Sequence, residues 1–196
     1  MDEAGPIQLI VGLGNPGAGY AATRHNAGFW LCDALAEFSG SPFRVESKYH
    51  GELAEYREGG VTARLLKPTT FMNRSGQAVA SLAHFYRIPP SAILVVHDEL
   101  DLPPGTVRVK VGGGHGGHNG LRDIINRLGD RGFVRLRVGI GHPGHRDDVV
   151  DYVLRKPSGS DREAILAALD DASREMPALV AGDLQAVMRR LHARPA

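Results

Sequence analysis

One histidine and one aspartate occupy positions at which they could form a general-base pair. His25 lies in the run Thr23-Arg24-His25-Asn26 at the start of an expected helix, and Asp98 ends a short apolar run. The positive end of a helix dipole disfavours a protonated histidine, and a neutral imidazole can accept a proton at pH 7. A carboxylate on its Nδ1–H would fix the tautomer. We therefore expect His25 to be a base oriented by Asp98, although two capping residues would give the same pattern.

Other histidines are spaced as metal ligands could be. His115-x-x-His118 lies in a loop with six glycines in nine residues (112–120), and His142-x-x-His145 lies in a second Gly/Pro turn. Zinc hydrolases combine histidines with a carboxylate on ordered elements, and a glycine-rich loop preorganises such ligands poorly. The sequence therefore predicts no metal and no cofactor, and His142 and His145 are expected to be surface turn residues.

The first glycine cluster, Gly12-Leu13-Gly14-Asn15-Pro16-Gly17, has the form G-x-G-x-x-G after an apolar run. In dinucleotide-binding proteins this motif opens a helix whose first turn holds a pyrophosphate. Here Asn15-Pro16 fixes a turn inside the motif, and the helix is delayed until about Arg24. A nicotinamide-dependent oxidoreductase is therefore the weaker alternative, and it predicts that NAD raises the melting temperature.

No residue has the sequence surroundings of a covalent nucleophile. No serine stands in a Gly-x-Ser-x-Gly elbow, and the single cysteine, Cys32, falls in the middle of an expected helix. Both features argue against a covalent enzyme intermediate. One cysteine also excludes an internal disulfide.

The basic residues are concentrated in one segment. The chain of 196 residues has 23 Lys and Arg against 22 Asp and Glu, yet residues 108–146 contain eight basic and two acidic side chains, a local net charge of +6. Such a field attracts polyanions, although a solvated basic face would look the same. No apolar stretch is long enough to span a membrane, and the acidic N-terminus lacks the layout of a signal peptide. We expect a soluble, cytoplasmic protein.

Strands and helices alternate along the chain. Short apolar runs bounded by turn residues predict strands over Ile7–Leu13, 43–48, 51–57, 61–67, Ala92–His97, Thr106–Val111 and Phe133–Ile140, with a hairpin turn at 58–60. Helical spacing predicts helices from a Thr23 cap to Gly40, from Ser75 to about Arg87, from about Asn119 to Leu128, and from a capping box at Ser160 to about His192. The prediction is a single α/β domain over 1–196, with a mixed, mostly parallel twisted sheet flanked by helices and a C-terminal helical segment.

Taken together and in order, these motifs resemble bacterial-type peptidyl-tRNA hydrolase. The resemblance extends over almost the whole chain and is carried by the runs 11–20, 23–28, 67–76, 97–105, 112–121 and 139–143. It implies a metal-free esterase that cuts the ester between a peptide and tRNA, with peptidyl-tRNA as its partner and a monomer as its state.

The resemblance also implies roles for individual residues. His25 would activate water and Asp98 would orient it. The amides of Asn15, Asn73 and Asn119 would contact substrate, and three further residues would line the same cleft: Tyr20, Met72 and His118. The tRNA phosphates would meet Arg108, Lys110 and Arg137, where Arg108 replaces a frequent lysine. A catalytically idle RNA-binding module would use the same basic face and is the second hypothesis; it predicts salt-sensitive tRNA binding without turnover.

Overall fold

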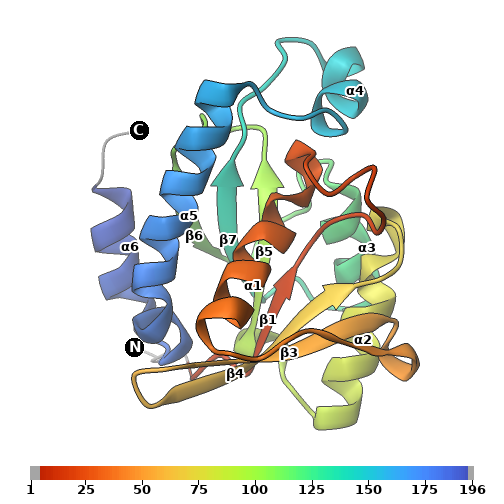
Figure 1. Cartoon of the computed structure of the whole chain (residues 1–196). Coiled ribbons are helices and arrows are strands. Elements are labelled where there is room, and N and C mark those ends of the chain that lie inside the picture. Colours follow the sequence, from red (N-terminus) through yellow and green to blue (C-terminus); the bar gives the residue numbers. More distant parts are fainter. Residues whose placement is uncertain (1–4, 194–196) are drawn as a thin grey trace.

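Seven strands form one twisted sheet in the order β2-β3-β4-β1-β5-β7-β6 (Figure 1). The computed structural model describes residues 5–193. The strands are β1 (Leu9–Gly12), β2 (Arg44–Glu46), β3 (Gly51–Glu58), β4 (Val61–Pro68), β5 (Ile93–Glu99), β6 (Val107–Val111) and β7 (Val134–Gly139). Strands β4, β1, β5 and β7 are parallel, and β2, β3 and β6 add antiparallel edges. The mixed, mostly parallel sheet expected from the sequence is confirmed.

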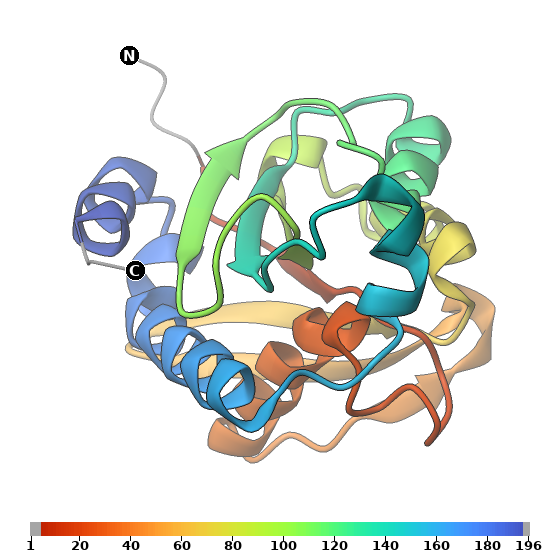
Figure 2. The same ribbon diagram turned by 90° about the horizontal axis from the view of Figure 1, so that it is seen from above.

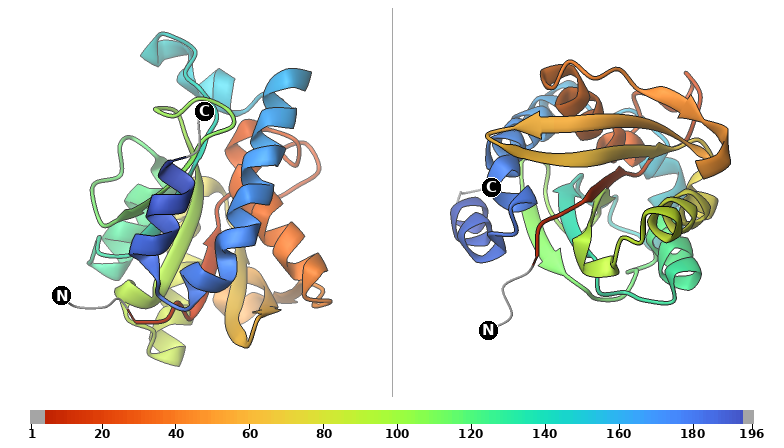
Figure 3. Two further views of the ribbon diagram at one scale, coloured as in Figure 1. Left: turned by 90° about the vertical axis from the view of Figure 1, so that its left-hand side faces the viewer. Right: turned by 90° about the horizontal axis from the view of Figure 1, so that it is seen from below.

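Helices cover both faces of the sheet (Figure 2). They are α1 (Ala27–Phe38), α2 (Ser75–Tyr86), α3 (Asn119–Leu128), α4 (Val149–Val153), α5 (Gly159–Val180) and α6 (Leu184–His192). Alternate residues of a buried strand face opposite layers, so Ile10 packs in the core under α1 and α5 and Leu9 in the core under α2 and α3. Figure 3 shows α6 beside α5, at the edge of the helix layer that contains α1 and α5. No helix within residues 5–193 is long and apolar enough to cross a membrane.

Several sequence predictions need correction at element ends. Helix α1 begins at Ala27 after a 3₁₀ turn, η1 (Arg24–Asn26), and the Thr23 hydroxyl bonds to the Tyr20 carbonyl instead of capping. The C-terminal helical segment is capped by Ser158, not by Ser160. It consists of two helices, because Gly182, with a φ of 91°, ends α5. The short helix α4 was not predicted. By contrast, Gly59 and Gly60 both have positive φ, as the expected hairpin requires.

The carboxyl ends of three adjacent strands converge at one edge of the sheet. Strand β1 lies between β4 and β5, and all three run parallel. Ligand sites of open α/β sheets lie outside such strand ends. The segments that follow β1 and β4 carry Asn15 and Asn73, and β5 extends two residues beyond the predicted end, which places Asp98 in the strand.

Candidate active site

Asp98 is a buried carboxylate that two histidines contact. The Nδ1 of His25 lies 2.8 Å from Asp98 Oδ2, and the Nε2 of His118 lies 2.9 Å from Asp98 Oδ1. The three residues come from η1, from β5 and from the loop that precedes α3. The Asp98 side chain is 2% exposed and that of His25 is 13% exposed. The structure therefore brings together the base pair expected from the sequence and adds a second histidine to it.

The hydrogen bonds define the tautomer of each histidine. An ionised carboxylate only accepts, so His25 Nδ1–H and His118 Nε2–H both donate to Asp98. His118 Nδ1 is itself an acceptor, because the backbone N–H groups of Gly120 and Leu121 donate to it at the start of α3. His25 Nε2 has no hydrogen-bond partner among residues 5–193 and keeps its lone pair available. His118 is thus a helix cap that holds Asp98, and His25 is the imidazole able to accept a proton.

Asp98 and His25 shift each other's pKa values towards the charged forms, and His118 adds to the shift of Asp98. Burial lowers the pKa of His25, but the Asp98 carboxylate and its hydrogen bond raise that pKa by more, so it ends above its ordinary value. For Asp98, burial acts in the opposite direction, yet His25 and His118 hold its pKa well below the usual range. The net direction of this pKa shift is therefore opposite to the one that the helix end alone predicts, because the Asp98 carboxylate lies 2.8 Å from the imidazole.

His97, the residue before Asp98, is a buried neutral histidine. Its Nδ1–H donates to the Asp98 carbonyl at 2.8 Å, and its ring packs edge-on against His118 with centroids 5.2 Å apart. Burial and the neighbouring His118 lower the pKa of His97 to about 4. His97 therefore supports the cluster as a packed, uncharged ring.

Asn15 makes three hydrogen bonds within the described part of the chain, which leave only its side-chain N–H groups free to bind a ligand. Its Oδ1 accepts from the backbone N–H of Met72 at 2.7 Å. Its own backbone N–H and C=O both bond to the side chain of Asn26 at 2.9 Å. The Nδ2 of Asn15 has no hydrogen-bond partner among residues 5–193. The sequence did not single out Asn26, although its position directly after His25 was the available signal.

Replacing Asn26 by alanine should lower the free energy of unfolding by about 2–3 kcal/mol, because two buried hydrogen bonds to Asn15 are lost. Urea denaturation followed by circular dichroism measures this change. Asn126→Ala, at an exposed position of α3, is the matched control and should stay within about 0.5 kcal/mol of the wild type. Equal effects of the two substitutions would contradict the role assigned to Asn26.

The remaining predicted substrate residues differ in their exposure. Tyr20 is half-buried and lies edge-on to the exposed ring of Phe71, with centroids 6.1 Å apart. Met72 is buried, and its sulfur packs against the backbone of Gly120 in the first turn of α3. Asn73 and Asn119 are exposed, on a 3₁₀ turn and at the start of α3, two elements that pack together.

The predicted phosphate contacts lie on the neighbouring strands β6 and β7. Arg108 and Arg137 are directly opposite in the antiparallel register, and Lys110 follows on the same face. Arg137 donates through Nε to Glu99 Oε1 at 2.9 Å, whereas Lys110 is exposed. Strand β7 also pairs with β5, and Arg137 lies opposite His97, the residue before Asp98.

His25, Asp98 and His118 also have the composition of a metal site, since their ligand atoms lie within 4.8 Å of one another. The hydrogen bonds account for the arrangement differently: both facing nitrogens carry protons directed at Asp98, and His118 Nδ1 is occupied by two backbone donors. A cation would have to displace both protons. The histidines spaced as ligands could be are otherwise engaged, because His115, His142 and His145 each accept a backbone N–H within their own turns. Burial raises the pKa of the Cys32 thiol to about 12.

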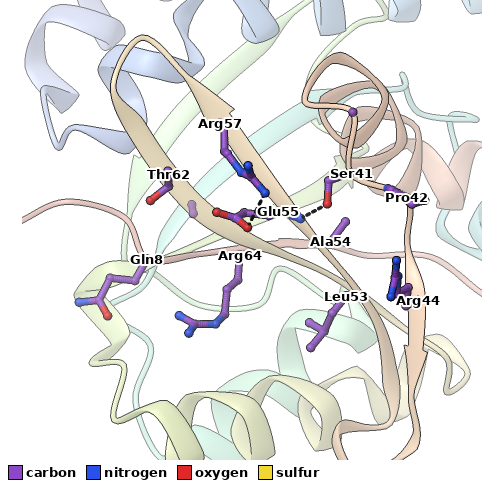
Figure 4. Close-up of a pocket in the computed structure, with 12 residues that line it drawn as sticks. Gln8, Ser41, Pro42, Arg44, Leu53, Ala54, Glu55, Arg57, Thr62 and Arg64 are labelled. Atoms are coloured by element: carbon purple, nitrogen blue, oxygen red, sulfur yellow. Dashed lines mark hydrogen bonds and ion pairs between the residues drawn. The ribbon is translucent and has the colours of Figure 1, made fainter.

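A separate surface hollow lies on β3 and β4, at the opposite end of β4 from the segment carrying Asn73 (Figure 4). Three of its charged side chains are engaged with neighbours: Arg57 pairs with Glu55 at 3.0 Å, and Arg64 stacks on Tyr86. None of the predicted site residues lines this hollow. The chemistry-bearing groups are instead at the carboxyl edge of the sheet.

Known proteins are similar to this chain in sequence and fold. The family model described as peptidyl-tRNA hydrolase matches residues 9–196. Over 194 residues, the chain is 58% identical to a peptidyl-tRNA hydrolase of Alkalilimnicola ehrlichii, with 98% of each chain covered. A relative from Coxiella burnetii is 57% identical, with 96% of this chain and 99% of the relative covered. The crystal structure of the peptidyl-tRNA hydrolase from Acinetobacter baumannii, 48% identical, superimposes with a TM-score of 0.92 over 95% of both chains. Because these matches extend over nearly the full length of each partner, the chain belongs to the peptidyl-tRNA hydrolase family.

Proposed function

We propose that this protein hydrolyses the ester bond between a peptide and the 3′ end of tRNA, using a water molecule activated by His25. The observation that carries the proposal is the available Nε2 of His25, whose opposite nitrogen donates to a carboxylate that His118 also holds. As Nε2 takes a proton from water, the buried Asp98 charge stabilises the imidazolium that forms. The water oxygen adds to the ester carbonyl carbon, and when the bond from that carbon to the ribose oxygen breaks, the imidazolium gives its proton to the departing ribose oxygen.

An ester of this kind needs few catalytic groups. It is more reactive than an amide, so one base and a few fixed dipoles can supply the required acceleration. The amides of Asn73 and Asn119 are exposed on two elements that pack together, and we propose that they hold the peptide or the attacking water. Because the hydrogen bonds to Asp98 already place a proton on each facing histidine nitrogen, we propose that the reaction is metal-independent.

The orientation of Asn15 favours substrates whose amino group is blocked. Because Oδ1 is engaged by Met72, Asn15 presents only N–H donors to the cleft. A peptide or acetyl carbonyl can accept from these donors, whereas the ammonium of an unblocked aminoacyl group has only donors itself. We therefore propose that Asn15 selects peptidyl-tRNA over aminoacyl-tRNA.

The basic face on β6 and β7 would grip the acceptor end of the tRNA. Arg108, Lys110 and Arg137 lie on one face of paired strands, and contacts to phosphate carry no base sequence. We propose binding that weakens with salt and depends little on tRNA identity. A substrate made during translation also places the protein in the cytoplasm, where we propose that it acts as a monomer.

The rate should fall at acidic pH with a midpoint above that of a free histidine. His25 is a base only when neutral, and Asp98, against the effect of burial, raises the pKa of His25. Lowering the pH through this raised pKa protonates Nε2 and removes the base, so kcat/KM should rise with pH through that value and then level off. A rate profile between pH 5 and 9 measures it; a midpoint below about 6.5 would contradict the assignment.

A release assay tests the proposed function itself. The wild-type protein should release N-acetylated aminoacyl groups from tRNA and should leave unblocked aminoacyl-tRNA largely intact. The idle RNA-binding alternative predicts salt-sensitive tRNA binding with no release from either substrate. Absence of release would therefore overturn the enzyme assignment, and equal release of both substrates would overturn the role of Asn15.

A further inference from the structure

The glycine-rich loop, residues 112–118, has few contacts of its own. Four of its glycines have positive φ: Gly112, Gly113, Gly116 and Gly117. A Cβ atom added at Gly114, Gly116 or Gly117 would meet nothing within 4 Å, so the space beside these Cα atoms is open. Glycine loses much conformational freedom on ordering, so a loop of this composition needs an external tie to hold one shape.

Arg135 on strand β7 supplies these external contacts by hydrogen bonding to the loop. Its guanidinium donates to the backbone carbonyls of Gly113, Gly114 and Arg131. The same group lies over the ring of Phe133, 4.5 Å from the ring centroid. The Phe133 carbonyl in turn accepts the backbone N–H of Gly112 at 3.0 Å. Arg135 therefore joins the middle of the loop to the end of the sheet.

Arg135 is a buried cation without a carboxylate partner. It is 2% exposed, and no ion pair to it forms within residues 5–193. An arginine that binds phosphate must present its guanidinium to solvent, which this side chain does not. Its Nη1–H and Nη2–H groups donate instead to carbonyl oxygens, whose partial negative charge balances the guanidinium, whereas its buried Nε has no hydrogen-bond partner within residues 5–193. Of the eight basic residues in segment 108–146, this one is thus directed inward.

We propose that Arg135 is a positioning residue that holds the glycine-rich loop in the shape that delivers His118 to Asp98. His118 follows Gly114 by four residues, and its backbone N–H bonds to the His115 carbonyl within the same loop. The inference rests on the proposed hydrolysis for its kinetic consequences, whereas its structural consequences can be measured without turnover. When the tie is lost, His118 leaves Asp98 while the contact between His25 and Asp98 remains.

The kinetic test compares Arg135→Met, which keeps a long apolar stem without donors, with Arg135→Lys, which keeps the charge. Arg135→Met should lower kcat by about 10- to 100-fold while KM stays within about twofold. Arg135→Lys should recover part of the loss, since one ammonium can still donate to a carbonyl. Arg174→Met, which removes an exposed arginine of α5, is the matched control and should behave as the wild type. A raised KM with unchanged kcat and a shallower salt dependence would show instead that Arg135 binds phosphate, and would overturn the proposal.

The pH profile separates positioning from simple loss of stability. Without His118 Nε2–H, the Asp98 carboxylate has one donor fewer and holds the proton on His25 more firmly. The acidic midpoint of kcat/KM should therefore move to higher pH in Arg135→Met. An unchanged midpoint, with a rate loss that follows only the unfolded fraction, would overturn the proposal.

Hydrogen exchange tests the same inference without substrate. The amide protons of Gly120 and Leu121 donate to His118 Nδ1 and report directly on the position of its ring. They should exchange faster in folded Arg135→Met, while amides in the β1–β5 ladder keep the wild-type rate. Unchanged exchange at Gly120 and Leu121 contradicts the proposal even if the wild-type protein hydrolyses its substrate. Faster exchange in a protein that hydrolyses nothing supports the loop tie and refutes only the proposed function.

Discussion

Replacing His25 by alanine should lower kcat/KM for an N-blocked aminoacyl-tRNA by about 10²- to 10⁴-fold, the contribution expected of a positioned general base. In the Asp98 cluster, His25 Nε2 is the nitrogen that can accept a proton, because His118 Nδ1 is occupied by Gly120 and Leu121. Asn15 and the basic face are not altered by the substitution, so KM should change little. The loss should appear in single-turnover rates with enzyme in excess.

The substitution also leaves Asp98 with one donor fewer, so folding must be measured alongside activity. His25→Asn is the second variant, because its amide N–H can still donate to the carboxylate while it offers no base. Its activity should be as low as that of His25→Ala. His84→Ala, at an exposed position of α2, is the matched control and should retain full activity. Near-wild-type rates in folded His25→Asn would show that another group activates the water.

Asp98→Asn should reduce the rate by about 10³- to 10⁴-fold, as expected when a base is held in the wrong tautomer. The carboxylate accepts from two histidines at once, at 2.8 and 2.9 Å. An asparagine has one oxygen and one NH₂ group, so it must present donors to one of them. If these donors face His25, its Nδ1 becomes the acceptor, the proton moves to Nε2, and the base is lost.

The same variant should move the acidic limb of any residual activity to lower pH. Asp98 raises the pKa of His25 against the opposing effect of burial, so removing the negative charge leaves burial to act alone. Asp170→Asn, in an exposed pair with Arg174, controls for the chemistry of the substitution and should leave rate and profile unchanged. A threefold or smaller rate loss in Asp98→Asn, or an unmoved acidic limb, would mean that the Asp98 charge does not act on His25.

The parts of this structure that the sequence predicts are those with a local signal. Gly59 and Gly60 between two alternating runs specify the hairpin, and α3 begins at Asn119 and ends at Leu128 as expected. Ser158 was missed as the cap of α5 because Ser160, followed by Glu163, imitates a capping box two residues later. Helix α4 has only five residues and no amphipathic period long enough to detect.

In the candidate site, too, the features with a local sequence signal could be predicted and those that depend on distant residues could not. The positions of His25 at a helix entry and Asp98 at a strand end are readable from pattern alone, and the structure places them in contact. The bond from His118 to Asp98 could not be read, because it depends on the path of a loop with four positive-φ glycines. The pKa direction of His25 was also misjudged, since it is decided by a residue 73 positions away. Arg135 is one of the eight basic residues expected to attract a polyanion, but its side chain is buried, and composition does not report burial.

Hydrolysis of N-acetyl-aminoacyl-tRNA by the wild type and by His25→Asn, each after exhaustive dialysis against EDTA, tests most directly whether a histidine-activated water acts without a metal. We predict that the chelated wild type keeps its full rate and that His25→Asn remains inactive with or without added zinc. Loss of wild-type activity that zinc restores, or full activity of His25→Asn, would contradict the mechanism.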